Sequence, residues 1–392
     1  MTSRNADQWQ TPPQLPPTHY VSGDVYTDPA IFDDERTKIF GRLWRFACHE
    51  SELAAPGDFR TLDHVGTPLI VIRGPDRIVR TFVNTCSHRG AKIIHEISGN
   101  AARLTCFYHL WSYDALGACI DIPRPEGYAA TGLRMDDCGL RAVRTETKFG
   151  LIFINMDDKA ASLEDFLAGS LDRFEDLLGG GELEVFHFNR TRIDANWKAW
   201  METNVDAYHT LMHVALRRTQ VDKGRTVDIF ENGHIGGGGQ KMNYDNYKGW
   251  NARTDSLALP GAPANDMRTT HLFPNAMVLS RGTVIRIDTI IPIDQRHTLI
   301  EFRGLGLKGD SNETRRTRMQ HHNQFWGPFG RNIPEDAFAA EACEKSFGGG
   351  AAQYQIIARD ENRTAQDDIG LRTFYAAWSA CVGRPPQAPS NR

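Results

Sequence analysis

The sequence predicts an α+β protein of two domains, in which a small antiparallel β domain precedes a larger domain with helices on an antiparallel sheet. The chain has 392 residues, which is more than one ordinary domain contains. From about residue 44 to residue 155, short β-type runs such as 69–73, 78–84 and 151–155 are separated by Gly and Pro. After residue 155, helical patterns and longer strand patterns are mixed, as in α+β domains.

An amphipathic helix is expected before the first domain. Asp28 is a suitable N-cap, Pro29 suits the first helical turn, and apolar residues recur at helical spacing from Ile31 to Phe40. The stretch Met1–Thr18 is polar and Pro-rich and lacks the apolar segment of a secretory signal, so we expect an extended or flexible arm there. We predict that residues 1–43 form an arm and a helix that pack on the larger domain.

Composition and charge exclude several classes of function. With 40% hydrophobic and 24% charged residues, the composition is that of a soluble globular protein. A net charge of −4 and the lack of a basic stripe argue against nucleic acid as a partner. No apolar run is long enough to span a membrane. Seven scattered cysteines without an export signal indicate reduced thiols, so we expect a cytoplasmic protein.

The most informative stretch has the pattern C-x-H-x17-C-x2-H. It contains Cys86, His88, Cys106 and His109, so each of two short loops offers one thiolate and one imidazole. Such a set can form a tetrahedral zinc site. It can also hold a [2Fe–2S] cluster with two thiolates on one iron and two imidazoles on the other. The spacing favours the cluster, because zinc sites usually place the two Cys together and the two His together.

The larger domain is expected to begin with a helix at Ser162, whose sequence has the form of a capping box. Strands are predicted at 185–192, 277–289 and 298–306, the last two joined by a turn that contains Pro292, and helices at 195–220, 315–326, 334–345 and 364–380. The glycine run 236–239 and the polar stretch 243–255 are predicted to be mobile surface segments.

Two histidines in the long predicted helix are candidate metal ligands. His209 and His213 stand four residues apart, so both would project from one helical face about one turn apart. A pair of this kind is weak evidence by itself, since most such pairs are surface or core groups. With one carboxylate it would form the 2-His-1-carboxylate triad of non-haem Fe(II) oxygenases.

Both motifs resemble those of aromatic ring-hydroxylating oxygenase α subunits. The two Cys/His loops resemble the Rieske domain of this family, although Leu110 stands where Gly is more frequent. Residues 196–213 are similar to the catalytic helix N-W-K-x-x-x-E-N-x-x-D-x-Y-H-x3-4-H, with Thr203 in place of Asn. The resemblance extends from Asp28 to Trp378, nearly the whole chain.

The resemblance implies a Rieske domain at 44–155 with a [2Fe–2S] cluster, and a helix-grip catalytic domain at 156–392 with a mononuclear Fe(II). The segment Pro-Glu335-Asp336-Ala is similar to the family segment whose Asp binds iron, which makes Asp336 the expected third ligand beside the two histidines. Asp360 is the rival carboxylate, and Glu335 is a weaker one.

Asp206 occupies the position of the family's bridging aspartate. The resemblance implies that it connects a histidine of the iron site to His109 of a neighbouring subunit and carries the electron path, since a carboxylate can orient two metal-bound imidazoles. The plain alternative is an ordinary surface aspartate. A path between subunits requires an oligomer, for which we expect a homotrimer (α3), or α3β3 if a small β subunit is present.

The expected function is that of a terminal oxygenase, which uses O2 to hydroxylate, in the simplest case to cis-dihydroxylate, an aromatic compound. The chain has no Rossmann or flavin fingerprint, so electrons must come from a separate NAD(P)H reductase, directly or through a ferredoxin. An oxidative demethylase of a quaternary ammonium or methoxy compound is the alternative, although such relatives often carry Glu at the position of Asp206. A purely electron-transferring Rieske protein would not need the second set of ligands.

An aromatic carboxylate is one candidate substrate, and it would need an arginine in the pocket. Arg281, Arg286 and Arg303 are candidates on the predicted sheet, and Thr203 is a further candidate pocket residue. In the structural alternative, Arg286 and Arg303 face acidic residues, Asp288 and Glu301, and cross-strand ion pairs account for all four charges.

Overall fold

The computed structural model describes residues 12–179, 182–206, 208–213, 226–241, 257–261, 266–358 and 367–387. The chain divides into two compact units. One unit is formed by Phe40–Leu163, and the other contains the described residues up to Ile39 together with those from Glu164 onward. The segment that precedes the smaller unit in the sequence therefore belongs with the larger one.

The smaller unit consists almost entirely of antiparallel strands. Its larger sheet has the order β2-β11-β10-β5-β4-β3-β6 and its smaller sheet the order β7-β8-β9. The strands are β2 Arg45–His49, β3 Asp58–His64, β4 Thr67–Arg73, β5 Val79–Val83, β6 Ser98–Asn100, β7 Arg103–Thr105, β8 Ser112–Asp114, β9 Cys119–Asp121, β10 Ala142–Lys148 and β11 Leu151–Asn155. The predicted small antiparallel β domain is confirmed.

Both faces of the larger sheet in this unit are covered. Along β4 the side chains alternate between two apolar clusters, with Leu69 and Val71 in one and Ile70 and Ile72 in the other. The second cluster also contains Cys86, Cys106, Trp111 and Tyr113, which lie in or next to the two Cys/His loops. The loops therefore pack on a rigid sheet face.

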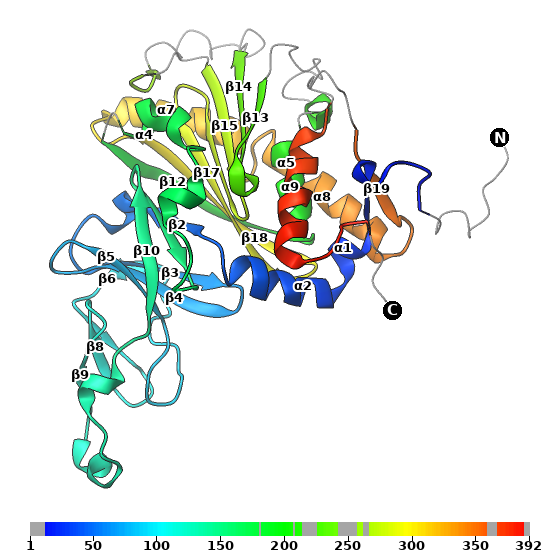
Figure 1. Ribbon diagram of the computed structural model, residues 1–392. Helices are drawn as coiled ribbons and strands as arrows, with labels where there is room; N and C mark the ends of the chain where they lie inside the picture. Colours follow the sequence, from blue (N-terminus) through cyan, green and yellow to red (C-terminus); the bar gives the residue numbers. More distant parts are fainter. Residues whose placement is uncertain are drawn as a thin grey trace. The chain divides into compact units, whose positions relative to one another are not determined.

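The larger unit is built on a seven-stranded antiparallel sheet of order β12-β18-β17-β16-β15-β14-β13. The strands are β12 Leu183–Ile193, β13 Thr226–Ile229, β14 Ile235–Lys241, β15 Asp266–Leu272, β16 Ala276–Ser280, β17 Ile285–Asp294 and β18 His297–Leu307. The helices are α1 Asp24–Thr27, α2 Pro29–Glu35, α3 Leu163–Leu167, α4 Glu175–Leu178, α5 Trp197–Val205, α7 Asn312–Trp326, α8 Ile333–Gly348 and α9 Ile369–Val382. Helices α5, α8 and α9 lie together beside the sheet (Figure 1), which confirms the predicted α+β architecture.

The predicted N-terminal helix is α2. The Asp28 carboxylate accepts a hydrogen bond from the Ala30 N–H at 2.8 Å, and Pro29 occupies the first turn, as expected for this cap. Upstream of it, β1 (Tyr20–Ser22) pairs with β19 (Tyr354–Ile356) near the end of the chain. Residues 1–11 of the expected arm lie outside the described residues.

The long helix predicted at 195–220 is wrong, because α5 ends at Val205. Asp206 has an extended backbone (φ −80°, ψ 116°), and a 3₁₀ turn follows at Tyr208–Met212. An aspartate favours the start of a helical segment because its carboxylate accepts hydrogen bonds from the next free N–H groups. Residues 214–225 lie outside the described residues.

The mobile loop predicted at 236–239 is also wrong, since these glycines lie in β14 between β13 and β15. A Cβ on Gly236 would stand 1.9 Å from Nη1 of Arg173, so the glycine leaves space for this guanidinium. The strand predicted at 277–289 is two strands, β16 and β17, and the turn before β18 follows Asp294 and does not contain Pro292. The stretch 243–255 lies outside the described residues.

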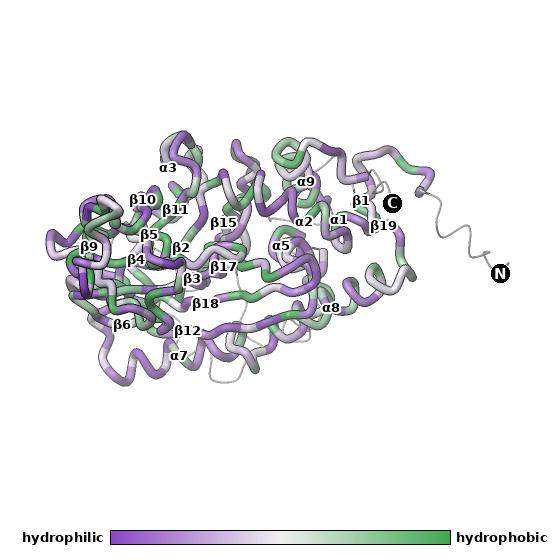
Figure 2. Tube along the Cα trace, turned by 90° about the horizontal axis from the view of Figure 1, so that it is seen from below, coloured by the Kyte–Doolittle hydropathy of each residue, from purple (hydrophilic) through white to green (hydrophobic). Residues whose placement is uncertain are grey.

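No described helix combines the length and the apolar character that would be needed to cross a membrane. Figure 2 agrees, because hydrophobic stretches along the described chain are short and are interrupted by hydrophilic residues.

Candidate functional sites

The two Cys/His loops are held by short β structure in the smaller unit. The loop with Cys86 and His88 is closed by a β-bridge between Thr85 and Lys92. The loop of residues 106–109 is the tip of the hairpin formed by β7 and β8. Loops closed in this way hold their side chains in place before a cofactor binds.

The sulfur side of this site is buried. The pKa of Cys106 is raised, first by burial and further by the neighbouring Cys86 thiol, so the two sulfurs lie close together. Cys86 Sγ is 3.2 Å from the hydroxyl of Tyr113, which also accepts a hydrogen bond from the N–H of Ser87 at 3.0 Å. Two adjacent thiols that lose their protons can bind one iron of a cluster.

The imidazole side lies beside aromatic rings. The rings of His88 and His109 are 4.5 Å apart, and His88 stacks on Trp111 at 4.9 Å. The hydroxyl of Tyr128 is 3.2 Å from Nε2 of His88, while Nδ1 of His88 is buried and has no hydrogen-bond partner among the residues that the structure describes. Burial, then the charges of His109 and Arg89, lower the pKa of His88, which favours the neutral form that binds metals.

Leu110, which departs from the family pattern, has a left-handed backbone with φ 62°. Glycine adopts this conformation without steric cost, which explains why glycine suits the position. The Leu110 side chain is 56% exposed, so it displaces no core residue, and the strained backbone is the cost of the substitution.

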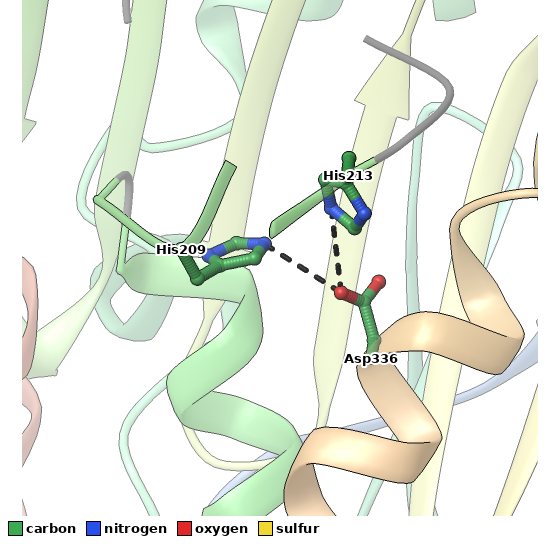
Figure 3. Close-up of side chains that lie close together, drawn as sticks. All are labelled: His209, His213 and Asp336. Carbon is green, nitrogen blue, oxygen red and sulfur yellow. Dashed lines mark ion pairs between the residues drawn. The ribbon is translucent and has the colours of Figure 1, made fainter. Parts of the chain in front are cut away.

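The second site combines residues from two distant segments. His209 and His213 lie in and just after the 3₁₀ turn that follows α5, and Asp336 lies in the first turn of α8 (Figure 3). One ligand atom from each of the three lies within 4.8 Å of the other two. Oδ1 of Asp336 is 3.6 Å from Nε2 of His209 and 3.4 Å from Nε2 of His213.

Hydrogen bonds fix the protonated nitrogen of each imidazole. Nδ1 of His209 contacts the carbonyl oxygen of Asp206, which can only accept, so Nδ1 carries the proton. Nδ1 of His213 lies 2.7 Å from Oε2 of Glu335, so the proton is again on Nδ1. Both Nε2 atoms therefore present lone pairs toward Asp336, as metal-bound histidines commonly do.

Asp336 supplies the third acceptor. Its Oδ1 is buried and receives no hydrogen bond from the described residues. Burial raises the pKa of Asp336 to about 8, although the charge of Arg286 acts in the opposite direction. The Nε2 atoms of the two histidines and the Asp336 carboxyl converge, and a cation in place of the carboxyl proton would be bound by all three. Two imidazoles with one carboxylate suit Fe(II).

The cluster ligands form a different kind of set. The thiols of Cys86 and Cys106 lie beside each other, and the rings of His88 and His109 are 4.5 Å apart. Pairing of thiol with thiol and imidazole with imidazole suits a two-iron cluster, in which each iron takes one kind of ligand.

Of the two rival carboxylates, Glu335 lies on the Nδ1 side of His213, away from the converging atoms, and Asp360 lies outside the described residues. Oδ1 of Asp206 accepts hydrogen bonds from the N–H groups of Tyr208 at 2.6 Å and His209 at 3.3 Å, so it caps the turn that carries His209. The hydroxyl of Thr203 donates to the carbonyl of Trp200 at 2.7 Å, within α5.

The predicted cross-strand pairs of the sheet arginines are instead pairs within one strand. Arg286 contacts both carboxylate oxygens of Asp288 at 2.8 Å, and Nη2 of Arg303 lies 2.9 Å from Glu301. Residues two apart on a strand share a face, so each pair forms without the neighbouring strand. Arg190 on β12 also pairs with Glu301 across two neighbouring strands.

Two residues of this region, one half-buried and one fully buried, were not expected as functional groups. Glu335 was considered only as a rival ligand, although its position next to Asp336 could have suggested contact with a neighbouring imidazole. His322, in α7, is fully buried beside the sheet. Nothing in its sequence spacing distinguishes it from surface histidines.

Comparison with known proteins assigns two regions of the chain to known domain families. Residues 43–134 match the family model of the Rieske [2Fe–2S] domain, and residues 176–383 match that of the ring hydroxylating alpha subunit catalytic domain. The chain is 43% identical to the 2-aminobenzenesulfonate 2,3-dioxygenase subunit alpha of Alcaligenes sp., covering 97% of this chain and 98% of the relative.

Two further relatives are informative. The methanesulfonate monooxygenase hydroxylase subunit alpha of Methylosulfonomonas methylovora is 39% identical, covering 99% of this chain and 97% of the relative. A structure of naphthalene 1,2-dioxygenase with bound indole superposes with a TM-score of 0.81 at 23% identity, covering 96% of this chain and 95% of the other. At this identity the superposition supports the fold alone.

Proposed function

Because the chain belongs to the Rieske ring-hydroxylating oxygenase α subunits, we propose that its substrate is a small organic sulfonate, preferably an arenesulfonate. The observation that carries this proposal is the nearly full-length similarity to two α subunits named for 2-aminobenzenesulfonate and for methanesulfonate. Those two compounds differ in carbon skeleton and share the sulfonate group. Conversion of an aromatic sulfonate to a cis-dihydrodiol is the expected reaction.

The residues proposed to hold the cofactors are those that the two sites bring together. The cluster ligands are Cys86, His88, Cys106 and His109, and the Fe(II) ligands are His209, His213 and Asp336. When bound, the mononuclear iron supplies the site at which dioxygen is activated next to the substrate.

The surrounding residues hold the proposed ligands in the correct protonation state. The carbonyl of Asp206 and the carboxylate of Glu335 each accept the Nδ1–H of one histidine, which keeps Nε2 available. The buried Asp336 remains a carboxylate only with compensating positive charge nearby, and a bound dication supplies it.

Electrons are proposed to come from a separate NAD(P)H reductase or a ferredoxin. The loop that contains His109 exposes large apolar side chains, with Phe107 65%, Tyr108 53% and Leu110 56% exposed. Apolar surface of this kind beside a redox centre suits contact with another protein. We further propose a homotrimer, with or without a small β subunit, in which Asp206 faces His109 of a neighbouring subunit.

A quaternary ammonium substrate is disfavoured by charge. Arg281 is 4% exposed and its charge acts on His213, so a cationic substrate would meet like charge beside the metal site. An aromatic carboxylate is the second candidate, because a guanidinium binds a carboxylate as well as a sulfonate.

The test is oxygen-dependent product formation by the iron-loaded enzyme after chemical reduction of the cluster. The panel contains benzenesulfonate, 2-aminobenzenesulfonate, methanesulfonate, benzoate and carnitine, with products identified by mass spectrometry. Oxygenated products from the sulfonates are expected. Products from benzoate or carnitine alone would reject the sulfonate and assign the corresponding alternative.

A further inference from the structure

The face of the large sheet beside the metal site carries a distinct set of residues. In the strand register, Gly304 of β18 is opposite both His187 of β12 and Arg286 of β17, and Phe302 is opposite Asp288. Directly opposed residues point to the same face of a sheet. This face also packs against α5, since the rings of Trp200 and Phe302 are 5.7 Å apart.

Arg303, a candidate substrate residue in the sequence, points the other way. It alternates with Phe302 and Gly304 along β18, and its partners are Glu301 and Thr289. Arg286 lies on the face of the metal site, but both oxygens of Asp288 contact it. Arg303 therefore does not reach the face of the metal site, and Arg286 is held by Asp288 on that face.

His322 of α7 lies over this face. Its ring is 4.6 Å from that of His187, and a Cβ on Gly304 would stand 3.0 Å from it, so the glycine makes space for the ring. His322 is fully buried, and within the described part of the chain neither ring nitrogen has a hydrogen-bond partner. Buried polar groups are normally satisfied, so an unpartnered imidazole indicates a missing ligand.

The protonation state of His322 defines what it can offer. Burial, followed by the charges of His187, Arg286 and Arg281, lowers its pKa well below the usual range. The ring is therefore neutral at pH 7, with one N–H to donate and one nitrogen that accepts.

Arg281 connects this histidine with the metal site. It is 4% exposed, and its guanidinium lies 4.2 Å from the centre of the Phe325 ring and 4.5 Å from that of Trp326. The ring of His322 is 5.7 Å from that of Trp326, so Arg281 and His322 both contact this indole. The charge of Arg281 also acts on His213. Stacking on an aromatic ring fixes the guanidinium plane parallel to the ring. The N–H groups then point outward in that plane, where they can donate hydrogen bonds to an oxyanion.

We propose that Arg281 and His322 form the anion-binding end of the substrate pocket, where they donate hydrogen bonds to the sulfonate oxygens while Trp326 contacts the aromatic ring. This inference rests on the proposed function and names the residues that select its substrate. A sulfonate offers three acceptor oxygens, which suits a fork of guanidinium donors plus one imidazole donor.

The experiment measures binding to the iron-loaded, oxygen-free enzyme by isothermal titration. The probes are benzenesulfonate and benzenesulfonamide, which has nearly the same shape but no charge. The variants are Arg281→Gln, Arg281→Lys and His322→Phe, and Arg190→Gln is the matched control, because it removes one guanidinium from the opposite face of the sheet.

Arg281→Gln is expected to weaken benzenesulfonate binding by about 10- to 100-fold, the effect of losing a charge-assisted hydrogen bond. His322→Phe is expected to weaken it by about 5-fold, and Arg281→Lys less than Arg281→Gln. Benzenesulfonamide binding should change by less than about 3-fold in every variant, and Arg190→Gln should behave as wild type.

Unchanged benzenesulfonate affinity in both Arg281→Gln and His322→Phe would overturn the inference, as would an equal loss for both probes. If Arg281→Gln does not fold, Arg281→Lys and His322→Phe decide the question alone. Turnover is recorded separately, so the two proposals can fail independently. Arg281-dependent binding without oxygenated product rejects the proposed function, whereas sulfonate oxidation with unchanged variant affinities rejects only this pocket assignment.

Discussion

Glu335 provides the sharpest test of how the iron site is built. Its Oε2 lies 2.7 Å from Nδ1 of His213, the side chain of the glutamate is 26% exposed, and that of the histidine is 3% exposed. A carboxylate that accepts from the far nitrogen makes the imidazole a stronger ligand and fixes its orientation. Glu335→Gln keeps an acceptor oxygen in place and removes the charge, while Glu335→Ala removes both.

We expect the affinity for Fe(II) to fall by about 10-fold in Glu335→Gln and by up to about 100-fold in Glu335→Ala. The assay is iron retention against a competing chelator, with the cluster content measured in the same samples by its absorption. Glu341→Gln is the control, because it changes the same helix but removes a carboxylate that bonds to the N–H of Asp194.

Wild-type iron affinity in Glu335→Ala would refute the reasoning, since the orienting hydrogen bond would then contribute nothing. An equal loss in Glu335→Gln and Glu335→Ala would assign the effect to charge and not to orientation.

Three further predictions concern the groups around this site. Asp336→Ala should lose the mononuclear iron and keep the cluster, whereas Asp360→Ala should keep both; iron analysis checks this, and the opposite result would make Asp360 the ligand. Asp206→Asn should keep iron, because the amide oxygen can still cap the turn, but should slow oxidation of the reduced cluster in the presence of substrate and O2. Asp206→Ala should impair both iron retention and oxidation of the reduced cluster. Wild-type cluster oxidation in Asp206→Asn would contradict a role of Asp206 in electron transfer. Burial raises the pKa of Glu202 to about 7 from about 4.5, so the folded state keeps a proton that the unfolded state releases, and stability should fall as pH rises through this window. The free energy of unfolding of Glu202→Gln should equal that of the wild type at pH 5 and exceed it by about 2 kcal/mol at pH 8, as measured by thermal unfolding. Parallel pH profiles of the variant and the wild type would exclude this effect.

The sequence was most informative where function fixes the spacing of residues. The two Cys/His loops and the histidine pair were visible before any coordinates, because metal ligands need particular residue types at particular separations. Asp336 was expected only because its segment resembles the family segment whose Asp binds iron. The α+β architecture followed from periodicity, and β18 and α7 were predicted to within a few residues at either end.

The errors arose where a local contact overrides the pattern. The apolar spacing after Asn196 is helical, but the carboxylate of Asp206 bonds to the next N–H groups and ends α5. The glycine run at 236–239 was predicted as a loop because the guanidinium of Arg173, which requires a glycine at position 236, comes from a distant segment. Long-range contacts of this type leave no periodic signal.

The ion pairs of the sheet also show that long-range strand pairing limits what the sequence can predict about the site. The alternation of Arg286 with Asp288 and of Glu301 with Arg303 is visible in the sequence, but the strand register decides which pair faces the metal site. Since a one-residue shift would exchange the two faces, the sequence alone could not decide whether Arg286 or Arg303 lies on the face of the metal site.

The N-terminal segment has a structural reason to belong to the catalytic unit. Glu35, at the end of α2, accepts hydrogen bonds from Nζ of Lys198 at 2.6 Å, from Nε1 of Trp197 at 2.7 Å and from Nε1 of Trp378 at 2.6 Å. Lys198 and Glu35 are both fully buried, and a buried ammonium without its carboxylate would cost roughly 3 to 5 kcal/mol. Helix α5, which leads into the ligand turn, is thus anchored by a residue that precedes the Rieske domain in the chain. The larger unit needs this residue for the buried charge of α5, so the residues before the smaller unit and those after it belong to one fold.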